Sequence, residues 1–192
     1  HKEYRRQRQM CIRDRFWGQP LFAVVAQTRE LARRAARLAK VRYRKLPHAL
    51  DIESATAAGH PYVTAPLTLQ RGEVDTALAG APHRLAGRMV VGGQDHFYLE
   101  GQIALAVPGE DAEVTVHVST QHPSEVQHMV SHALGVPANA VTVSVRRMGG
   151  GFGGKETQMN LFACVAAIAA KRLKCAVKLL SLIHISEPTR LR

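Results

Sequence analysis

Apolar and polar positions in the central part of the chain predict a strand, a helix and a second strand. Residues 114–118 alternate between apolar and polar side chains, the pattern of a half-buried strand, and residues 141–145 repeat it. Between them lies a segment with helical spacing, in which Pro123 suits the first turn and Gly135 suits the end. The apolar stripe of this helix is formed by Val126, Met129, Val130, Ala133 and Leu134.

Three further elements are expected next to this unit. Residues 96–100 and 102–107 are strand-like, and the turn-forming sequence at 108–111 ends the second of these segments. Residues 157–171 are apolar on almost every side, which predicts a buried helix.

The first third of the chain predicts another strand–helix–strand unit. Residues 20–26 form a short apolar run that is typical of a buried strand. Thr28 is a suitable N-cap for the next segment, in which apolar residues recur at helical spacing opposite several arginines. Residues 41–46 alternate and predict a strand, and residues 55–66, rich in small side chains with Gly and Pro, indicate a loop or linker.

The central crossover connection determines where its two strands end. A helical crossover makes two strands of one sheet parallel, so both strands end at the same edge. Gln121 follows the first strand, and the glycine-rich segment 149–154 follows the second. Ligands bind outside the carboxyl ends of such strands. The order of elements therefore predicts that Gln121 and the glycine-rich segment border one pocket.

The two ends of the chain do not continue these patterns. Residues 1–15 and 180–192 show no apolar period and no signal-peptide pattern, and both resemble translated sequencing adapters. We therefore expect non-native segments, with natural disordered tails as the alternative. The whole chain has a formal charge of +11, whereas residues 16–179 hold 18 Lys and Arg against 12 acidic residues. A large part of the basic charge therefore lies in the ends.

The remaining charge and hydropathy argue against two classes of partner. Arginines cluster within residues 29–40, but no aromatic stacking pattern or base-reading motif accompanies them, so no nucleic-acid partner is expected. The longest apolar run, 161–170, is too short to cross a bilayer, so no membrane partner is expected. Cys164 lies in that run, which favours core packing, and the absence of a disulfide framework fits a reducing compartment.

The sequence MGGGFGGKE, residues 148–156, contains the most informative candidate chemistry. Five glycines within 149–154 cost backbone entropy, and they are useful where the main chain approaches a ligand or where its N–H groups bind an anion. A flexible loop without a ligand is the alternative. The segment also matches the phosphate-loop pattern up to Lys155, but that pattern then requires Ser or Thr where this chain has Glu156.

His128 and His132 are four residues apart on the predicted central helix, a spacing that can bind zinc. The metalloprotease motif requires Glu where Met129 stands, and both histidines lie off the apolar stripe. A solvated helix face is therefore expected here in place of a metal site.

Three separate motifs of the chain share an order and a spacing with one enzyme family. They are GGQDHFYLE at 92–100, STQHPSEVQ at 119–127, and RRM at 146–148, which leads into the glycine-rich segment. Together they resemble the molybdenum-cofactor subunit of the xanthine dehydrogenase/aldehyde oxidase family, over nearly all of residues 16–179. The resemblance implies a mixed α+β or α/β fold, in which residues 16–70 end an alpha/beta hammerhead domain and residues 71–179 begin a molybdopterin-binding domain. It also implies an internal piece of a longer subunit.

The same resemblance assigns roles in cofactor binding. Gln121 is expected to hydrogen-bond an oxygen ligand of the molybdenum, and the backbone at Phe152 and Gly153 to contact the apical ligand of the metal and the cofactor. Gly151 and Gly154 complete this cofactor-binding loop. None of these is a direct ligand in the usual sense, because the pterin dithiolene holds the ion.

Glu156 is expected, on the same resemblance, to bind a purine through a hydrogen bond. Each assignment keeps a simpler alternative when the residues are considered alone. Glu156 could stand near a helix N-terminus for reasons of the helix dipole. Gln121 could cap the helix that begins at Pro123, and Phe152 could pack into the core beneath a glycine turn.

The implied reaction is the oxidation of hypoxanthine and xanthine to urate with water as the oxygen source. Electrons would pass through 2Fe-2S clusters and FAD in a partner subunit to NAD, within a cytoplasmic heterotetramer or larger assembly. The general base and a purine-pairing arginine would lie beyond residue 179, so the chain alone is expected to be inactive. The alternatives are an aldehyde oxidase or other molybdenum hydroxylase, whose aldehyde-oxidising members tend to lack a carboxylate at the position of Glu156, and a non-catalytic phosphate- or nucleotide-binding module.

Overall fold

The computed structural model describes residues 20–62 and 64–181. Contacts within the chain divide it into two units, of which one comprises residues 40–93 and the other the remainder. The expectations for residues 1–15 and for almost all of 180–192 lie outside the described residues.

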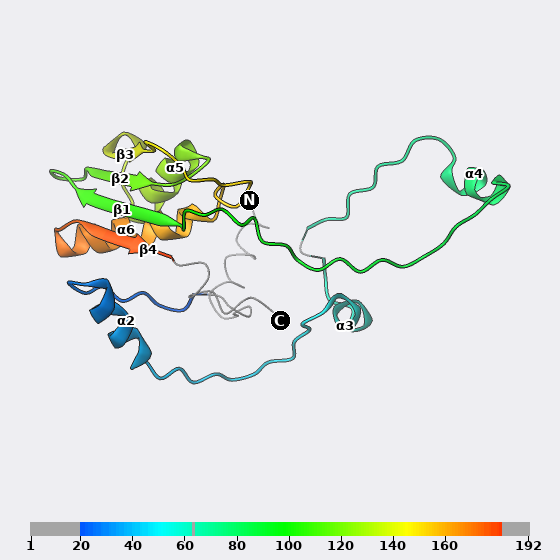
Figure 1. The fold of residues 1–192 in the computed structure, drawn as a ribbon, viewed down its shortest axis with the longest axis horizontal. Coiled ribbons are helices and arrows are strands. Elements are labelled where there is room, and N and C mark those ends of the chain that lie inside the picture. The colour runs from blue at the N-terminus through cyan, green and yellow to red at the C-terminus, as the bar shows by residue number, and fades with distance from the viewer. Residues whose placement is uncertain (1–19, 63, 182–192) are drawn as a thin grey trace. The chain divides into compact units, whose positions relative to one another are not determined.

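The centre of the larger unit is a four-stranded sheet with the strand order β3-β2-β1-β4 (Figure 1). Its strands are β1 (Ile103–Pro108), β2 (Val114–Val118), β3 (Val141–Ser144) and β4 (Val177–Leu180). β2 and β3 pair in parallel, with Val116 opposite Val143, whereas β1 runs antiparallel to both β2 and β4. The parallel pair and the helix between its strands confirm the predicted strand–helix–strand unit.

Helix α5 (Pro123–Leu134), which joins β2 to β3, begins and ends where the sequence predicts. Pro123 stands in its first turn, and Gly135 ends it in the left-handed conformation with a φ of 66°. Val126 and Val130 are fully buried, but Met129 is 41% exposed, so the predicted apolar stripe is too wide. A short 3-10 helix, Ala138–Ala140, then leads into β3.

Helix α6 (Met159–Leu173) packs on the same face of the sheet as α5 through a row of alanines (Figure 1). This row consists of Ala163, Ala166, Ala167 and Ala170, all buried. The strand opposite, β1, contributes Ala104 and Ala106, which are also fully buried. The prediction of a buried helix is therefore confirmed for the side of α6 that carries the alanines. Leu161, on the same helix, remains 48% exposed.

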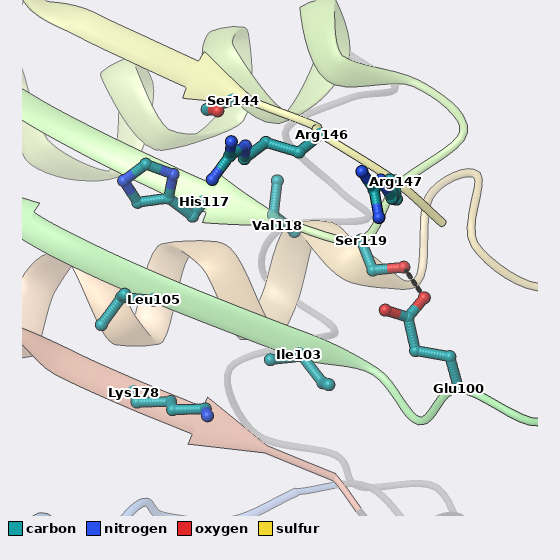
Figure 2. Close-up of a pocket in the computed structure, with 10 residues that line it drawn as sticks. All are labelled: Glu100, Ile103, Leu105, His117, Val118, Ser119, Ser144, Arg146, Arg147 and Lys178. Atoms are coloured by element: carbon teal, nitrogen blue, oxygen red, sulfur yellow. Dashed lines mark hydrogen bonds between the residues drawn. The ribbon is translucent and has the colours of Figure 1, made fainter. Parts of the chain in front are cut away.

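Within the described residues no helix packs on the other face of the sheet, which is only half buried. Figure 2 shows Ile103, Leu105, His117 and Lys178 on this side, with the helices behind the strands. The burial pattern of β1 shows the difference between the two faces of the sheet. Along this strand the buried alanines alternate with half-buried Ile103 and Leu105.

Strand β4 is an element that the sequence analysis does not predict. Val177, Lys178 and Leu179 alternate in burial, and β4 extends to Leu180, one residue past the expected boundary at 179. The backbone N–H of Ser181 then donates to the carbonyl of Gln102 at 2.9 Å. The chain is therefore hydrogen-bonded to the sheet through the last residue that the structure describes.

Three other predicted strands, at residues 20–26, 41–46 and 96–100, are irregular in the structure, and these predictions are wrong. A strand forms only where a neighbour satisfies its backbone N–H and C=O groups, and alternation of side chains does not supply that neighbour. In the last segment Phe97 also adopts a φ of 53°, which interrupts an extended backbone.

Helix α2 (Arg29–Arg37) confirms the predicted N-cap. The Thr28 hydroxyl accepts a hydrogen bond from the Leu31 N–H at 3.2 Å, and Glu30 stands in the first turn, near the positive end of the helix dipole.

The smaller unit, residues 40–93, contains helices α3 (Ile52–Ala57) and α4 (Val74–Gly80). α3 extends into the segment that was expected to be a loop. In the described part of this unit no residue is buried, and several large apolar side chains, such as Leu67 and Leu69, are almost completely exposed. Within residues 20–62 and 64–181, no helix combines the length and apolar character that crossing a bilayer requires.

Replacement of Met159 tests the core beneath α6. Met159 is fully buried, so Met159→Ala should lower the free energy of unfolding by about 2–5 kcal/mol, through lost apolar burial and a residual cavity. Leu161→Ala, on the exposed side of the same helix, is the matched control and should cost much less. Urea denaturation followed by circular dichroism measures both, and equal losses would contradict this description of the core.

Candidate functional site

Gln121 and the glycine-rich segment meet at one edge of the sheet. The side-chain oxygen of Gln121, Oε1, accepts hydrogen bonds from the N–H groups of Gly153 at 3.0 Å and Lys155 at 3.3 Å. The backbone N–H of Gln121 donates to the Lys155 carbonyl at 2.8 Å. These contacts confirm that the carboxyl ends of β2 and β3 bring the two segments together.

The two acceptor contacts of Gln121 also fix which way its amide faces. Both neighbours are N–H donors, so the oxygen must face the glycine loop and the Nε2 group must face away from these donors. Among the described residues, Nε2 has no hydrogen-bond partner. The site therefore presents an oriented N–H donor beside the loop.

Helix capping does not explain Gln121. The N-cap of α5 is His122, whose Nδ1 accepts from the Glu125 N–H at 3.3 Å. The capping alternative for Gln121 is therefore wrong.

The glycines allow the loop to approach Gln121 more closely than any other residue would. A Cβ atom at Gly151 would lie 2.5 Å from Gln121 Oε1, well inside van der Waals contact. Gly153 has a φ of 87°, which favours glycine, and its N–H is one of the two groups that bind Gln121. Gly154 closes the turn, because its N–H donates to the Gly151 carbonyl at 2.7 Å.

Phe152 lies at the tip of this turn in an unusual backbone conformation. Its φ is 50°, which is unfavourable for a large side chain, and the side chain is 74% exposed. The alternative that Phe152 packs in the core is therefore wrong. A strained residue of this kind persists where its surroundings hold it, and such residues cluster at ligand sites.

A buried lysine, which the sequence analysis does not place in the site, lies directly behind the loop. The Lys155 side chain is fully buried, and its Nζ donates to Glu100 Oε2 at 2.8 Å and to the Ser119 hydroxyl at 2.9 Å. The ammonium group also lies 4.8 Å from the centre of the Tyr98 ring. A lysine in this position does not reach a phosphate in front of the loop, which argues against the phosphate-loop interpretation.

Glu100 connects Lys155 to the beginning of the glycine loop. The Gly149 N–H donates to Glu100 Oε2 at 2.7 Å, and the Ser119 hydroxyl donates to the same oxygen (Figure 2). Partial burial raises the pKa of the Glu100 carboxyl, but the hydrogen bonds from Lys155, Ser119 and Gly149, together with the charge of Lys155, lower it more. The net pKa is below the ordinary value of 4.5.

A second set of contacts holds the end of the loop. Gln102 Nε2 donates to the Tyr98 hydroxyl at 2.8 Å and to the Gly154 carbonyl at 3.4 Å. The Thr120 hydroxyl donates to the Lys155 carbonyl at 3.1 Å. Within the described residues, the buried Oε1 of Gln102 has no hydrogen-bond partner.

Glu156 follows Lys155 and is exposed. It lies outside α6, which begins at Met159 with Gln158 as its N-cap residue. Its carboxylate therefore stands close to the N-terminus of α6, so the helix-dipole alternative and the ligand-binding role both remain predictions.

An open pocket adjoins the site on the uncovered face of the sheet. It is lined by Glu100, Ile103, Leu105, His117, Val118, Ser119, Ser144, Arg146, Arg147 and Lys178 (Figure 2). Arg146 and Arg147 follow β3 and lead into the glycine loop, so this surface is predominantly basic.

The two histidines considered for zinc lie exposed on α5, and Cys164 packs against the core. His128 and His132 are exposed, with their ring centres 4.6 Å apart, and no group of three or more His, Cys, Asp or Glu suited to a metal occurs in the described part of the chain. Cys164 packs against the core, as predicted, and burial raises the pKa of its thiol.

Comparison with known proteins identifies the class to which this fold and site belong. Residues 57–183 match the molybdopterin cofactor-binding domain family, which is more than half of the chain. The chain therefore belongs to this family. Within it, the chain is similar to the molybdopterin-binding region of xanthine dehydrogenases.

Two relatives illustrate this similarity. The chain is 44% identical over 163 residues to the xanthine dehydrogenase of Drosophila pseudoobscura pseudoobscura, covering 84% of this chain and 12% of that protein. It is 42% identical over 154 residues to the xanthine dehydrogenase/oxidase of Gallus gallus, covering 80% of this chain and 11% of that protein. The chain thus spans only about an eighth of the length of these relatives.

Solved structures support the mixed α+β fold. Quinoline 2-oxidoreductase from Pseudomonas putida 86 superposes with a TM-score of 0.67 at 25% identity, covering 82% of this chain and 21% of that one. The aldehyde oxidoreductase of Desulfovibrio gigas gives a TM-score of 0.66 at 23% identity, covering 81% and 18%, and shows the fold alone.

The residues at the sheet edge fit a molybdopterin cofactor. The Gln121 amide donor, which has no partner among the described residues, suits an oxygen acceptor, and the loop leaves no room for a side chain at Gly151, so the loop backbone is held close to the Gln121 side chain. Phe152 presents its backbone in a strained turn beside the same amide.

The pKa of Glu100 predicts how stability depends on pH. Because the folded-state pKa is lowered, ionised Glu100 stabilises the fold above the ordinary value of 4.5, and this contribution disappears as pH falls through the folded-state value. Glu100→Gln should therefore reduce the free energy of unfolding at pH 7, and the difference from the unmodified protein should shrink as pH falls below the ordinary value of 4.5 and through the lower folded-state pKa. Urea denaturation across this range measures it. Glu110→Gln, at an exposed turn, is the control, and a pH-independent difference would contradict the assignment.

Proposed function

We propose that the chain is part of a xanthine dehydrogenase, a molybdenum hydroxylase that oxidises hypoxanthine and xanthine to urate with water as the oxygen source. The observation that carries this proposal is the attachment of Gln121 to the glycine loop by the N–H groups of Gly153 and Lys155. This attachment directs one amide donor away from the loop backbone. Residues 16–70 would end an alpha/beta hammerhead domain, and residues 71–179 would begin the molybdopterin-binding domain.

In this proposal the chain contributes residues that bind the cofactor. The Nε2 group of Gln121 would donate to an oxygen ligand of the molybdenum, and the backbone of Phe152 and Gly153, with Gly151 and Gly154 on either side, would lie against the metal centre and the pterin. When bound, the cofactor supplies the two-electron oxidation of the purine carbon. The role of the protein is to orient that group with donors that need no rearrangement during the reaction.

Glu156 would contribute recognition of the purine. Its carboxylate is exposed directly after the loop that would hold the cofactor, and a carboxylate can accept a hydrogen bond from a purine N–H. Electrons would leave through 2Fe-2S clusters and FAD of a partner subunit to NAD, in a cytoplasmic assembly of at least four subunits.

Replacement of Gln121 tests the central observation. Gln121→Glu keeps an oxygen acceptor for the N–H groups of Gly153 and Lys155 but removes the Nε2 donor. In the complete enzyme we expect kcat for xanthine to fall at least about tenfold, with little change in the free energy of unfolding. Steady-state kinetics and urea denaturation measure these quantities. Gln158→Glu, at an exposed position, is the matched control, and unchanged turnover in Gln121→Glu would refute the proposed role.

Replacement of Glu156 separates purine from aldehyde oxidation. Glu156→Val in the complete enzyme should lower kcat/KM for xanthine by about 10- to 100-fold, the range expected for a lost hydrogen bond to a charged group. An aldehyde substrate should lose much less, because it does not offer the purine N–H. Glu110→Val provides a control with the same chemical change away from the site. Equal losses for both substrates would favour an aldehyde oxidase or another molybdenum hydroxylase.

A further inference from the structure

We propose that Glu100 and Lys155 form a clamp that fixes the glycine loop in one conformation and so positions Gln121 and the Phe152 backbone for the cofactor. These two residues, with the bridging Ser119, are called the clamp below. The inference rests on the proposed function, because it concerns the same site.

A single oxygen atom joins both ends of the loop. Glu100 Oε2 accepts from the Gly149 N–H at 2.7 Å, where the loop begins, and from Lys155 Nζ at 2.8 Å, where it ends. The Glu100 N–H also donates to the Gly149 carbonyl at 3.4 Å. Because glycine has more backbone freedom than any other residue, a segment with five glycines requires restraints from outside itself, and Glu100 supplies them at both ends.

The buried position of Lys155 indicates that its charge has a specific role. Its side chain is fully buried, whereas the Glu100 side chain is 30% exposed. A buried ammonium group is costly unless it is paired, and Lys155 pairs with Glu100, Ser119 and the face of the Tyr98 ring. Buried ion pairs contribute less to stability than apolar packing does, and their best-supported use is to specify one arrangement.

The backbone of Lys155 transmits this restraint to Gln121. The Lys155 N–H donates to Gln121 Oε1, and the Lys155 carbonyl accepts from the Gln121 N–H. Any displacement of Lys155 therefore moves both groups that orient the Gln121 amide. The clamp acts through Gln121 and the loop backbone, so Glu100 and Lys155 are positioning residues.

Hydrogen exchange and kinetics of the complete enzyme test the clamp together. In Glu100→Gln and Lys155→Met, amide exchange in residues 149–155 should increase at least about tenfold, while exchange in α5 and β1 stays unchanged. Per bound molybdenum, kcat for xanthine should fall at least about tenfold and KM should change less than about threefold, because misplaced cofactor contacts affect the reaction more than purine binding. Ser119→Ala is a milder change and should show the same effects to a smaller extent. It provides the test if Glu100→Gln or Lys155→Met does not fold.

Matched controls are Glu110→Gln and Lys45→Met, which change exposed residues of the same types away from the site and should leave both measurements unchanged. Unchanged exchange in residues 149–155 would overturn the clamp, and so would an increase spread evenly over the whole domain. If the unmodified enzyme binds molybdenum but does not oxidise xanthine, the proposed function fails, while the exchange experiment still decides whether the clamp exists.

Discussion

The parallel pairing of β2 with β3 determines the rest of the site. Two parallel strands joined by a helix end at the same edge, so Gln121 and the glycine loop are neighbours although Gly149 comes 28 positions after Gln121 in the sequence. The hydrogen bonds between Gln121 and the glycine loop follow from this topology. The antiparallel strand β1 then brings the segment before it, including Glu100, to the same edge from the other side. Three separate parts of the chain thus meet without any long loop.

Local strain and buried charge at this edge are balanced by hydrogen bonds. Phe152 holds an unfavourable φ, and Lys155 buries an ammonium group, and each would be costly alone. The N–H groups of Gly149, Gly153 and Lys155 and the Lys155 ammonium group have partners on Gln121 or Glu100. The same contacts that satisfy the loop also leave Gln121 Nε2 free among the described residues. The stability of the loop and the orientation of the Gln121 amide therefore depend on one set of atoms.

The sequence predicts which segments of the chain meet at this site better than it predicts the buried contacts between them. The meeting of Gln121 with the glycine loop follows from the order of elements, and the start and end of α5 follow from Pro123 and Gly135. The pairing of Lys155 with Glu100 does not, because the two are 55 residues apart and a lysine beside a loop is usually solvated. The alternation at 41–46 predicts a strand that is absent, since no neighbouring strand pairs with it in the described chain.

The alanine row of α6 has a mechanical consequence. Ala163, Ala166, Ala167 and Ala170 belong to one core cluster with Ala104 and Ala106 of β1, so small side chains separate helix and strand and little space remains between them. A larger side chain at any of the four alanines would therefore push α6 away from the sheet. Because α6 begins at Met159, four residues after Lys155, the packing of this helix also restrains the point where the glycine loop ends.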